Sequence, residues 1–128
     1  MISILIVEDD VYLQKLYELM LDMQGYEVIA KARNGNEAIE IFKSLKTKPD
    51  IILMDHRMPI KNGIETTIEL TKINSNSNII FISADNSVKN QALSIGAKVF
   101  IEKPFSIEQL HQEIKNVITN TGLLQSTS

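Results

Sequence analysis

Three carboxylates stand side by side in the sequence, where Glu8, Asp9 and Asp10 follow the apolar run at residues 4–7. Crowded carboxylates raise one another's pKa unless a cation compensates their charge. The chain has no cysteine and neither of its two histidines lies in this cluster, so the donors are oxygens, which favour a hard ion such as Mg2+ or Mn2+. The cluster therefore predicts a metal site, although an acidic residue such as Asp10 is also typical of a helix cap.

Three more reactive side chains, Asp55, Ser83 and Lys103, come at or just after the end of other short apolar segments. Singly, each is typical of an ordinary loop or turn. Beside a metal ion the three can accept a phosphoryl group, because the ion and the ammonium neutralise its oxygens and the hydroxyl donates a hydrogen bond. The set therefore predicts Asp55 as the nucleophile of a phosphoryl transfer.

The segments that must position these side chains alternate between two periodicities. Five short apolar runs are typical of strands, at 3–7, 27–32, 51–54, 78–83 and 98–101. Five stretches of helical period lie between and after them, at 11–25, 36–45, 63–73, 87–95 and 107–118. Continuous apolar strands are typical of a parallel sheet covered by helices on both faces. We therefore expect an α/β fold, a doubly wound (βα)5 five-stranded parallel sheet, with ligand chemistry at the carboxyl ends of its strands.

Individual residues indicate which side of the first helix faces the core and where some of the helices begin or end. The stripe expected to face the core from the first helix consists of Leu13, Leu16, Tyr17, Met20 and Leu21. Gly25 is expected to end that helix, Asn36 is a candidate N-cap of the second, and Ser106 precedes the last.

Composition narrows the class of protein. A chain of 128 residues with 44% apolar residues can bury the core of one domain, which we expect at 1–119, followed by a flexible tail at 120–128. A formal net charge of −3 gives no electrostatic basis for direct binding to nucleic acid. The apolar runs are too short to span a membrane and cysteine is absent, so a cytoplasmic protein is expected.

Four motifs, "ILIVEDD", "DIILMDHRMPIKNG", "IIFISA" and "VFIEKPF", together resemble the receiver domain of two-component response regulators over residues 2–117. The resemblance implies a stand-alone receiver with a flavodoxin-like fold, which is a phosphoprotein rather than an enzyme acting on other substrates. It implies that a sensor histidine kinase or a histidine phosphotransferase phosphorylates Asp55.

The resemblance also implies how the phosphorylation site is built. Asp9 would bind Mg2+ directly, Glu8 would act through water, and the backbone carbonyl of Arg57 would complete the protein ligands with Asp55. Lys103 matches the invariant lysine of the family and precedes a peptide bond that is cis in many of its members.

A switch is implied as well. Ser83 matches the hydroxyl residue that moves toward the phosphoryl group, and Phe100 matches the aromatic residue that then turns inward. The surface formed by the fourth helix, fifth strand and fifth helix would thereby change for a downstream protein target that the sequence does not name. The sequence also leaves open a homodimer that forms on phosphorylation. Phe100 is equally typical of an ordinary core aromatic.

Some residues depart from the family pattern. Lys61 stands where an apolar residue is usual, so we expect either a difference in packing under that loop or a lysine that faces a partner. Arg57 and Asp85 carry opposite charges at positions that flank the phosphoryl group, and our hypothesis is that they meet over it and restrict attacking water. We do not expect His56 to act as a phosphodonor, and His111 is expected to be solvated.

Other classes of protein fit the residues less well. A flavodoxin-like cofactor binder needs backbone amides where Glu8 and Asp9 would repel a phosphate. A cobalamin-binding module has one residue between its aspartate and its histidine, whereas Asp55 and His56 are adjacent. A haloacid-dehalogenase-type phosphatase has a second aspartate two residues after its nucleophile, where this chain has Arg57. The remaining alternative is a degenerate receiver that acts as an unphosphorylated scaffold.

Overall fold

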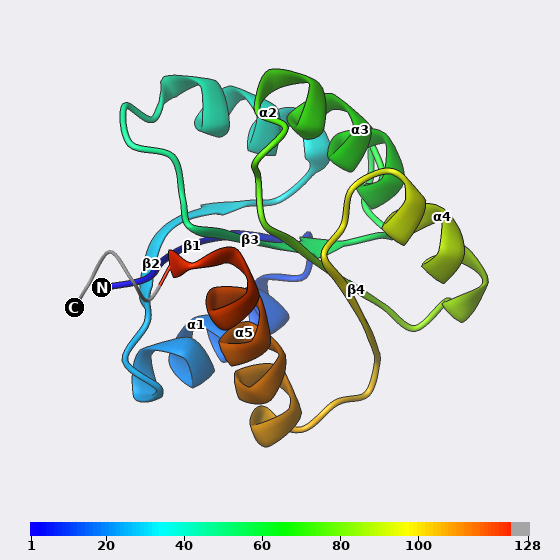
Figure 1. Cartoon of the computed structure of the whole chain (residues 1–128). Helices are drawn as coiled ribbons and strands as arrows, with labels where there is room; N and C mark the ends of the chain where they lie inside the picture. The colour runs from blue at the N-terminus through cyan, green and yellow to red at the C-terminus, as the bar shows by residue number, and fades with distance from the viewer. Residues whose placement is uncertain (124–128) are drawn as a thin grey trace.

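The computed structural model describes residues 1–123, in which strands and helices alternate along the chain (Figure 1). The strands are β1 (Ser3–Val7), β2 (Glu27–Ala32), β3 (Ile51–Asp55), β4 (Ile79–Ser83) and β5 (Val99–Glu102). The helices are α1 (Val11–Met23), α2 (Gly35–Ser44), α3 (Gly63–Ile73), α4 (Lys89–Ser94) and α5 (Ile107–Thr121), and a short 3-10 turn (Asn86–Val88) precedes α4. The predicted order of five strands and five helices is confirmed.

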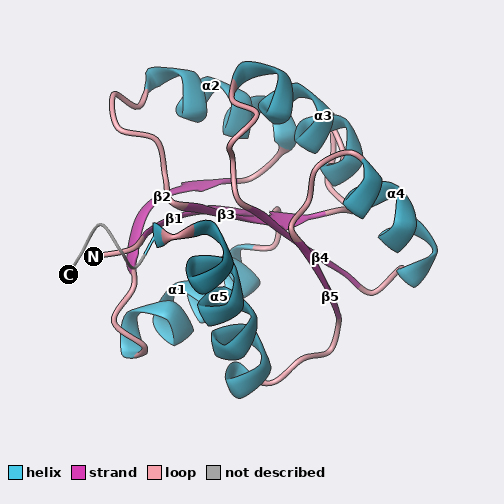
Figure 2. Ribbon diagram, in the orientation of Figure 1, coloured by secondary structure: helices cyan, strands magenta, loops and turns pink. Residues whose placement is uncertain are grey.

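All neighbouring strands are parallel, in the order β2-β1-β3-β4-β5. Helices α1 and α5 cover one face of the sheet, and α2, α3 and α4 cover the other (Figure 2). The chain runs from β1 outward to β2 and then crosses to β3 on the opposite side of β1. A crevice is expected at such a reversal, outside the carboxyl ends of β1 and β3.

The central strands are buried on both faces, as their continuous apolar sequences predict. All five residues of β3 and of β4 are buried. Alternate residues of β1 pack into two separate cores, Ile4 and Ile6 toward α1 and α5, Leu5 and Val7 toward the other layer. This double burial fixes the register, because a shift by one residue would exchange the two cores.

The buried face of α1 differs from the predicted stripe. Gln14, Tyr17, Met20 and Leu21 are buried, whereas Leu16 is 49% exposed. Gln14 is buried because its amide has two backbone acceptors, described below, which a hydrophobicity pattern does not reveal.

N-terminal helix caps hold the loops that connect the carboxyl ends of the strands to the helices that follow. Asp10 caps α1 by accepting hydrogen bonds from the backbone N–H groups of Tyr12 and Leu13. The N-cap of α2 is Asn34 rather than Asn36, since Asn34 has the extended backbone of a cap and its side chain accepts from Glu37 N.

The remaining helix ends agree closely with the sequence. Ser106 caps α5, and α1 ends at the C-cap Gln24, just before Gly25 with φ of +87°. Helix α5 continues through Thr121, two residues into the segment expected as a tail, and residues 124–128 lie outside the described part. None of the helices described within residues 1–123 is long and apolar enough to cross a membrane.

The first residue of α3 leaves no room for a side chain. A Cβ atom at Gly63 would lie 2.3 Å from the carbonyl oxygen of Asp55 and 2.8 Å from Cα of His56. The backbone N–H of Gly63 also donates to the carbonyl of His56 at 2.8 Å. Gly63 therefore allows α3 to begin directly against the end of β3.

We expect Gly63→Ala to lower the free energy of unfolding by more than about 3 kcal/mol, because backbone would have to move. Gly25→Ala is the matched control, since nothing lies within 4 Å of its Cβ position and only the positive φ opposes the change. That control should lose about 1 kcal/mol. Urea denaturation measures both, and equal losses would contradict the steric argument.

Candidate functional site

Three carboxylates meet at the crevice between β1 and β3. Glu8 and Asp9 follow β1 directly, and Asp55 ends β3, where Val7 is paired with Met54 across the two strands. One carboxylate oxygen from each acid lies within 4.8 Å of the others. Glu8 and Asp55 are buried, whereas Asp9 is exposed. The structure thus brings together Glu8 and Asp9 of the acidic run with Asp55, whereas Asp10 caps α1.

Lys103, in the loop after the edge strand β5, reaches the two buried acids. The Lys103 ammonium lies 3.0 Å from Oδ1 of Asp55 and 3.4 Å from Oε1 of Glu8. Its backbone N–H donates to the carbonyl of Ser83 at 3.0 Å, which ties the loop after β5 to the end of β4. The Lys103–Pro104 peptide bond is cis, as the family resemblance implies.

Burial dominates the electrostatics of the acids. It raises the pKa of Glu8 to about 7, against the lowering effect of a hydrogen bond from the backbone N–H of Asp10. Burial also raises the pKa of Asp55, although the hydrogen bond from Lys103 acts in the opposite direction. For Lys103, burial is the largest single effect and lowers the pKa, but the hydrogen bond to Asp55 and the nearby negative charges, which include Asp55 and Glu8, together outweigh it, so the pKa is raised and the amine stays charged. One ammonium thus faces three carboxylates.

The residues present fit a hard divalent cation. The cluster offers only oxygen donors, and burial, which raises the pKa values of Glu8 and Asp55, makes their charged forms costly unless a cation beside Lys103 helps to compensate them. A cavity of about 270 Å³ opens above them. Its lining includes every acid of the cluster and the predicted partners Arg57, Ser83 and Lys103.

The hydroxyl of Ser83 lies beside this cavity at the end of β4. Ser83 is buried, and its Oγ accepts a hydrogen bond from the backbone N–H of Asp85 at 3.0 Å. A hydroxyl can accept this bond and still donate its own proton, so Ser83 keeps a donor for an anion in the cavity.

Arg57 and Asp85 meet at the mouth of the cavity, as the sequence hypothesis requires. Nη2 of Arg57 lies 3.6 Å from Oδ2 of Asp85. Hydrogen bonds from Ser87, first its hydroxyl and then its backbone N–H, lower the pKa of Asp85, and Arg57 adds to the effect. The Arg57 side chain is 81% exposed, so this ion pair contributes little to stability.

Phe100 lies on β5 in a row of aromatic rings. Its ring stacks on Phe81, which is fully buried, with centroids 6.0 Å apart, and His56 packs on the other side of Phe81 at 5.7 Å. Phe100 itself is half-buried. The row of rings thus connects His56, the residue after Asp55, to Phe100, the predicted switch residue. Sequence reasoning missed Phe81 because its position beside Phe100 depends on the pairing of β4 with β5.

Sequence reasoning also missed two side chains of α1 that support the acids. Nε2 of Gln14 donates to the carbonyls of Glu8 and Ala32 at 2.7 and 2.9 Å. Burial raises the pKa of Tyr17 to about 12, with the charges of Lys103 and Glu8 close enough to act on it. The sequence does contain a signal for both: Gln14 and Tyr17 carry polar groups but lie on the same helical face as the apolar Leu21.

One expectation is met only in part and another is wrong. Lys61 forms an ion pair with Glu69 of its own chain at 2.7 Å, which fits the expected difference in packing at this loop rather than the partner contact. His111 is half-buried rather than solvated, and its Nδ1 lies 3.2 Å from the hydroxyl of Tyr26. Both contacts join residues whose proximity depends on how the helices and loops pack.

The fold and this set of side chains define a class of α/β signalling modules. The chain belongs to the response regulator receiver domain family, whose model matches residues 4–115. The predicted family is therefore confirmed, and the protein is a response regulator receiver of the two-component type.

Similar proteins agree with this assignment. The chain is 39% identical to the chemotaxis protein CheY of Thermotoga maritima over 116 residues, covering 89% of this chain and 95% of that protein. Identity to CheY of Bacillus subtilis is 35%, with coverage of 90% and 96%. Among solved structures, a CheX–CheY complex with BeF3 and Mg2+ from Borrelia burgdorferi matches with a TM-score of 0.88 at 29% identity, covering 91% of this chain and 89% of that one.

The electrostatics predict a pH dependence of stability in the presence of a chelator. The folded state keeps a proton on Glu8 up to a pKa of about 7, whereas its ordinary value is 4.5. The stabilisation from this proton is therefore complete below about pH 4.5 and is lost as the pH rises through about 7. Lys103 does not contribute in this window, because its raised pKa leaves the amine charged in both states.

We expect the free energy of unfolding to fall by on the order of 2 kcal/mol between pH 5 and 8 in EDTA, and Glu8→Gln to remove much of that slope. Millimolar Mg2+ should raise the melting temperature of the wild type at pH 8 more than that of Glu8→Gln. Urea titrations at each pH measure the first effect. Equal slopes for both proteins would contradict the assignment of the slope to Glu8.

Proposed function

We propose that the protein accepts a phosphoryl group on Asp55 from a phosphohistidine of a sensor histidine kinase or histidine phosphotransferase. The observation that carries the proposal is the ammonium of Lys103 at 3.0 Å from Oδ1 of Asp55, inside an acidic cluster suited to Mg2+. A lysine in this place can neutralise an oxygen of an incoming phosphoryl group while it stays bound to the carboxylate.

The transfer follows from the positions of the side chains. A carboxylate oxygen of Asp55 attacks phosphorus, the P–N bond of the phosphohistidine breaks, and its electron pair returns to the imidazole of the donor. The product on this chain is an acyl phosphate. Lys103 and the Ser83 hydroxyl bind its oxygens. Asp9, Asp55 and the Arg57 carbonyl would hold Mg2+, with Glu8 acting through water, and the ion would supply further charge neutralisation.

The downstream effect we propose is a change in the surface of α4, β5 and α5. The Ser83 hydroxyl moves toward the phosphoryl group, and Phe100 turns into the space that this movement opens. Since Phe100 lacks a hydroxyl, its inward state is held by packing, and stacking on Phe81 already orients the ring. The partner that reads this surface is a protein, in the cytoplasm, and not nucleic acid.

Asp55 is the residue whose replacement tests this proposal. Intact mass after incubation with Mg2+ and acetyl phosphate should show one added phosphoryl group on the wild type, and none on Asp55→Asn or without metal. Lys103→Met should reduce the rate of modification at least tenfold, which corresponds to a barrier higher by more than about 1.4 kcal/mol.

A matched control is Lys98→Met, which removes an exposed lysine just before β5. Phosphoramidate serves as a second donor. If the wild type gains no phosphoryl group from either donor, the chain is an unphosphorylated scaffold and the proposal is wrong.

The ion pair at the cavity mouth predicts the lifetime of the acyl phosphate. Arg57→Ala and Asp85→Ala should each shorten the lifetime by about fivefold, which corresponds to ~1 kcal/mol, because water then reaches phosphorus more freely. Lys72→Ala, at the far end of α3, is the control. Decay of the phosphorylated mass with time measures all three, and unchanged lifetimes in both mouth variants would refute the covering role.

A further inference from the structure

A second cavity lies at the amino ends of the strands, on the opposite edge of the sheet from the phosphorylation site. Two residues of its lining, Ile2 and Tyr26, directly precede the parallel strands β1 and β2, and the others lie on α5. Its volume is about 240 Å³, and its lining consists of Ile2, Tyr26, His111, Lys115, Ile118 and Thr119. None of these residues lines the cavity above Asp55, so the two sites are separate.

The walls of this amino-edge cavity are mostly apolar. Ile118 is buried in the core between the sheet and the layer of α1 and α5, and Ile2 packs against the same core. The rings of Tyr26 and His111 lie 5.8 Å apart with 50° between their planes, a tilted arrangement typical of aromatic contacts. Apolar walls beside two rings favour a ligand with a flat, apolar body.

Each polar side chain of the lining can donate a hydrogen bond. Burial raises the pKa of Tyr26, so its hydroxyl keeps its proton at neutral pH. The hydroxyl oxygen lies 3.2 Å from Nδ1 of His111. When the hydroxyl donates to Nδ1, the neutral imidazole carries its own proton on Nε2, which is then a donor. The ammonium of Lys115 and the hydroxyl of Thr119 add further donors.

No negative charge opposes these donors. Within residues 1–123 no acidic side chain lines the cavity, and Lys115 takes part in no ion pair. The nearest acids along the chain are Glu27 and Glu113, and the carboxylate of Glu113 accepts a hydrogen bond from Asn116 at 3.1 Å. A positive charge without a counter-charge beside apolar walls favours an anion with an apolar body.

We propose that the amino-edge cavity binds a small aromatic monocarboxylate. The carboxylate accepts charge-assisted hydrogen bonds from the Lys115 ammonium and from Nε2 of His111. The ring of the ligand lies against Ile2 and Ile118. One ammonium matches one negative charge, and apolar walls would leave several oxygens of a phosphate without partners. Sites for drug-sized ligands measure ~300–1,000 Å³, so a cavity below this range suits about ten non-hydrogen atoms, the size of benzoate.

A nuclear magnetic resonance titration of the isotope-labelled full chain with benzoate in EDTA tests the proposal. The backbone amide signals of Ile2, Tyr26 and residues 111–119 should shift and saturate, with a Kd of about 1 mM or below. Those of Asp55 and Ser83 should not move. Benzamide lacks the charge and acetate lacks the ring, so each should bind at least tenfold more weakly. Shifts that do not saturate, or that benzamide produces equally, overturn the proposal.

Three substitutions separate the contributions of charge, hydrogen bonding and space. Lys115→Gln removes the charge and should weaken benzoate binding at least tenfold. Tyr26→Phe keeps the ring but no longer fixes the imidazole proton on Nε2, so it should weaken binding about threefold. Thr119→Phe changes an exposed residue and fills the cavity, so saturable binding should be lost. Benzoate binding that survives both Lys115→Gln and Thr119→Phe would refute the site.

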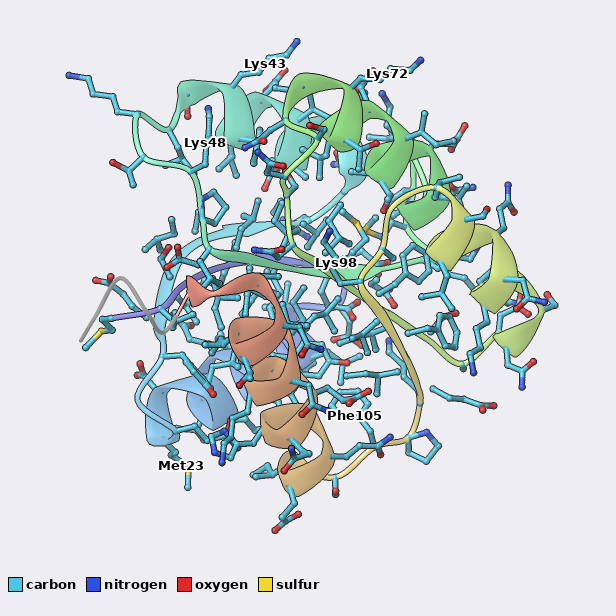
Figure 3. The ribbon with its side chains drawn as sticks, viewed as in Figure 1. Met23, Lys43, Lys48, Lys72, Lys98 and Phe105 are labelled. Carbon is cyan, nitrogen blue, oxygen red and sulfur yellow. The ribbon has the colours of Figure 1, made fainter. Side chains whose placement is uncertain are left out.

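Lys72→Gln is the matched control for charge, since this exposed lysine lies on α3, in the other layer of the sheet (Figure 3). It should bind benzoate like the wild type, and an equal loss in Lys72→Gln and Lys115→Gln would contradict the proposal. Circular dichroism checks that each variant is folded. Asp55→Asn should also bind like the wild type, because the cavity is separate from the phosphorylation site.

Discussion

The structure depends above all on negative charge held in a nearly dry crevice. Glu8 and Asp55 are buried side by side, a costly arrangement unless opposite charge is supplied. Lys103 supplies one positive charge from across the sheet, and the exposed Asp9 adds a third carboxylate at the rim. The remaining imbalance suits the site to a cation, and under the proposed function cation and ammonium together would reduce the repulsion between Asp55 and an incoming phosphoryl group.

The rest of the fold serves to keep these groups in place. The reversal of strand order brings the ends of β1 and β3 together, and burial on both faces prevents either strand from slipping by one residue. Gln14 holds the backbone of Glu8 against that of Ala32, so the corner after β1 cannot open. Gly63 lets α3 begin against Asp55 without a side chain between them. Each of these contacts acts on the backbone that carries an acid, so the fold itself holds the acids close together.

Sequence reasoning succeeded where position along a strand determines position in space. Glu8, Asp55, Ser83 and Lys103 lie at strand ends, and parallel strands bring their carboxyl ends to one edge, so the site followed from the order of elements. It failed where contacts depend on packing across elements. Leu16 was assigned to the core because hydrophobic periodicity cannot distinguish a helix with one apolar face from a helix with two, and the pairing of Lys61 with Glu69 depends on how the loop before α3 folds back on it. Asn34 was missed as a cap because two asparagines lie within three residues and only the backbone angles decide between them.

Helix α1 links the phosphorylation site to the surface of the molecule in a way that α4 does not. Its N-cap Asp10 adjoins the acidic cluster, and its buried Gln14 and Tyr17 contact or face the charged groups there. The α4 layer is built differently, since α4 spans only Lys89–Ser94, has no side-chain N-cap, and lies over a half-buried aromatic ring on β5. Fewer contacts thus hold α4 in place than hold α1, which suits the α4–β5 face to a contact that depends on the state of Asp55.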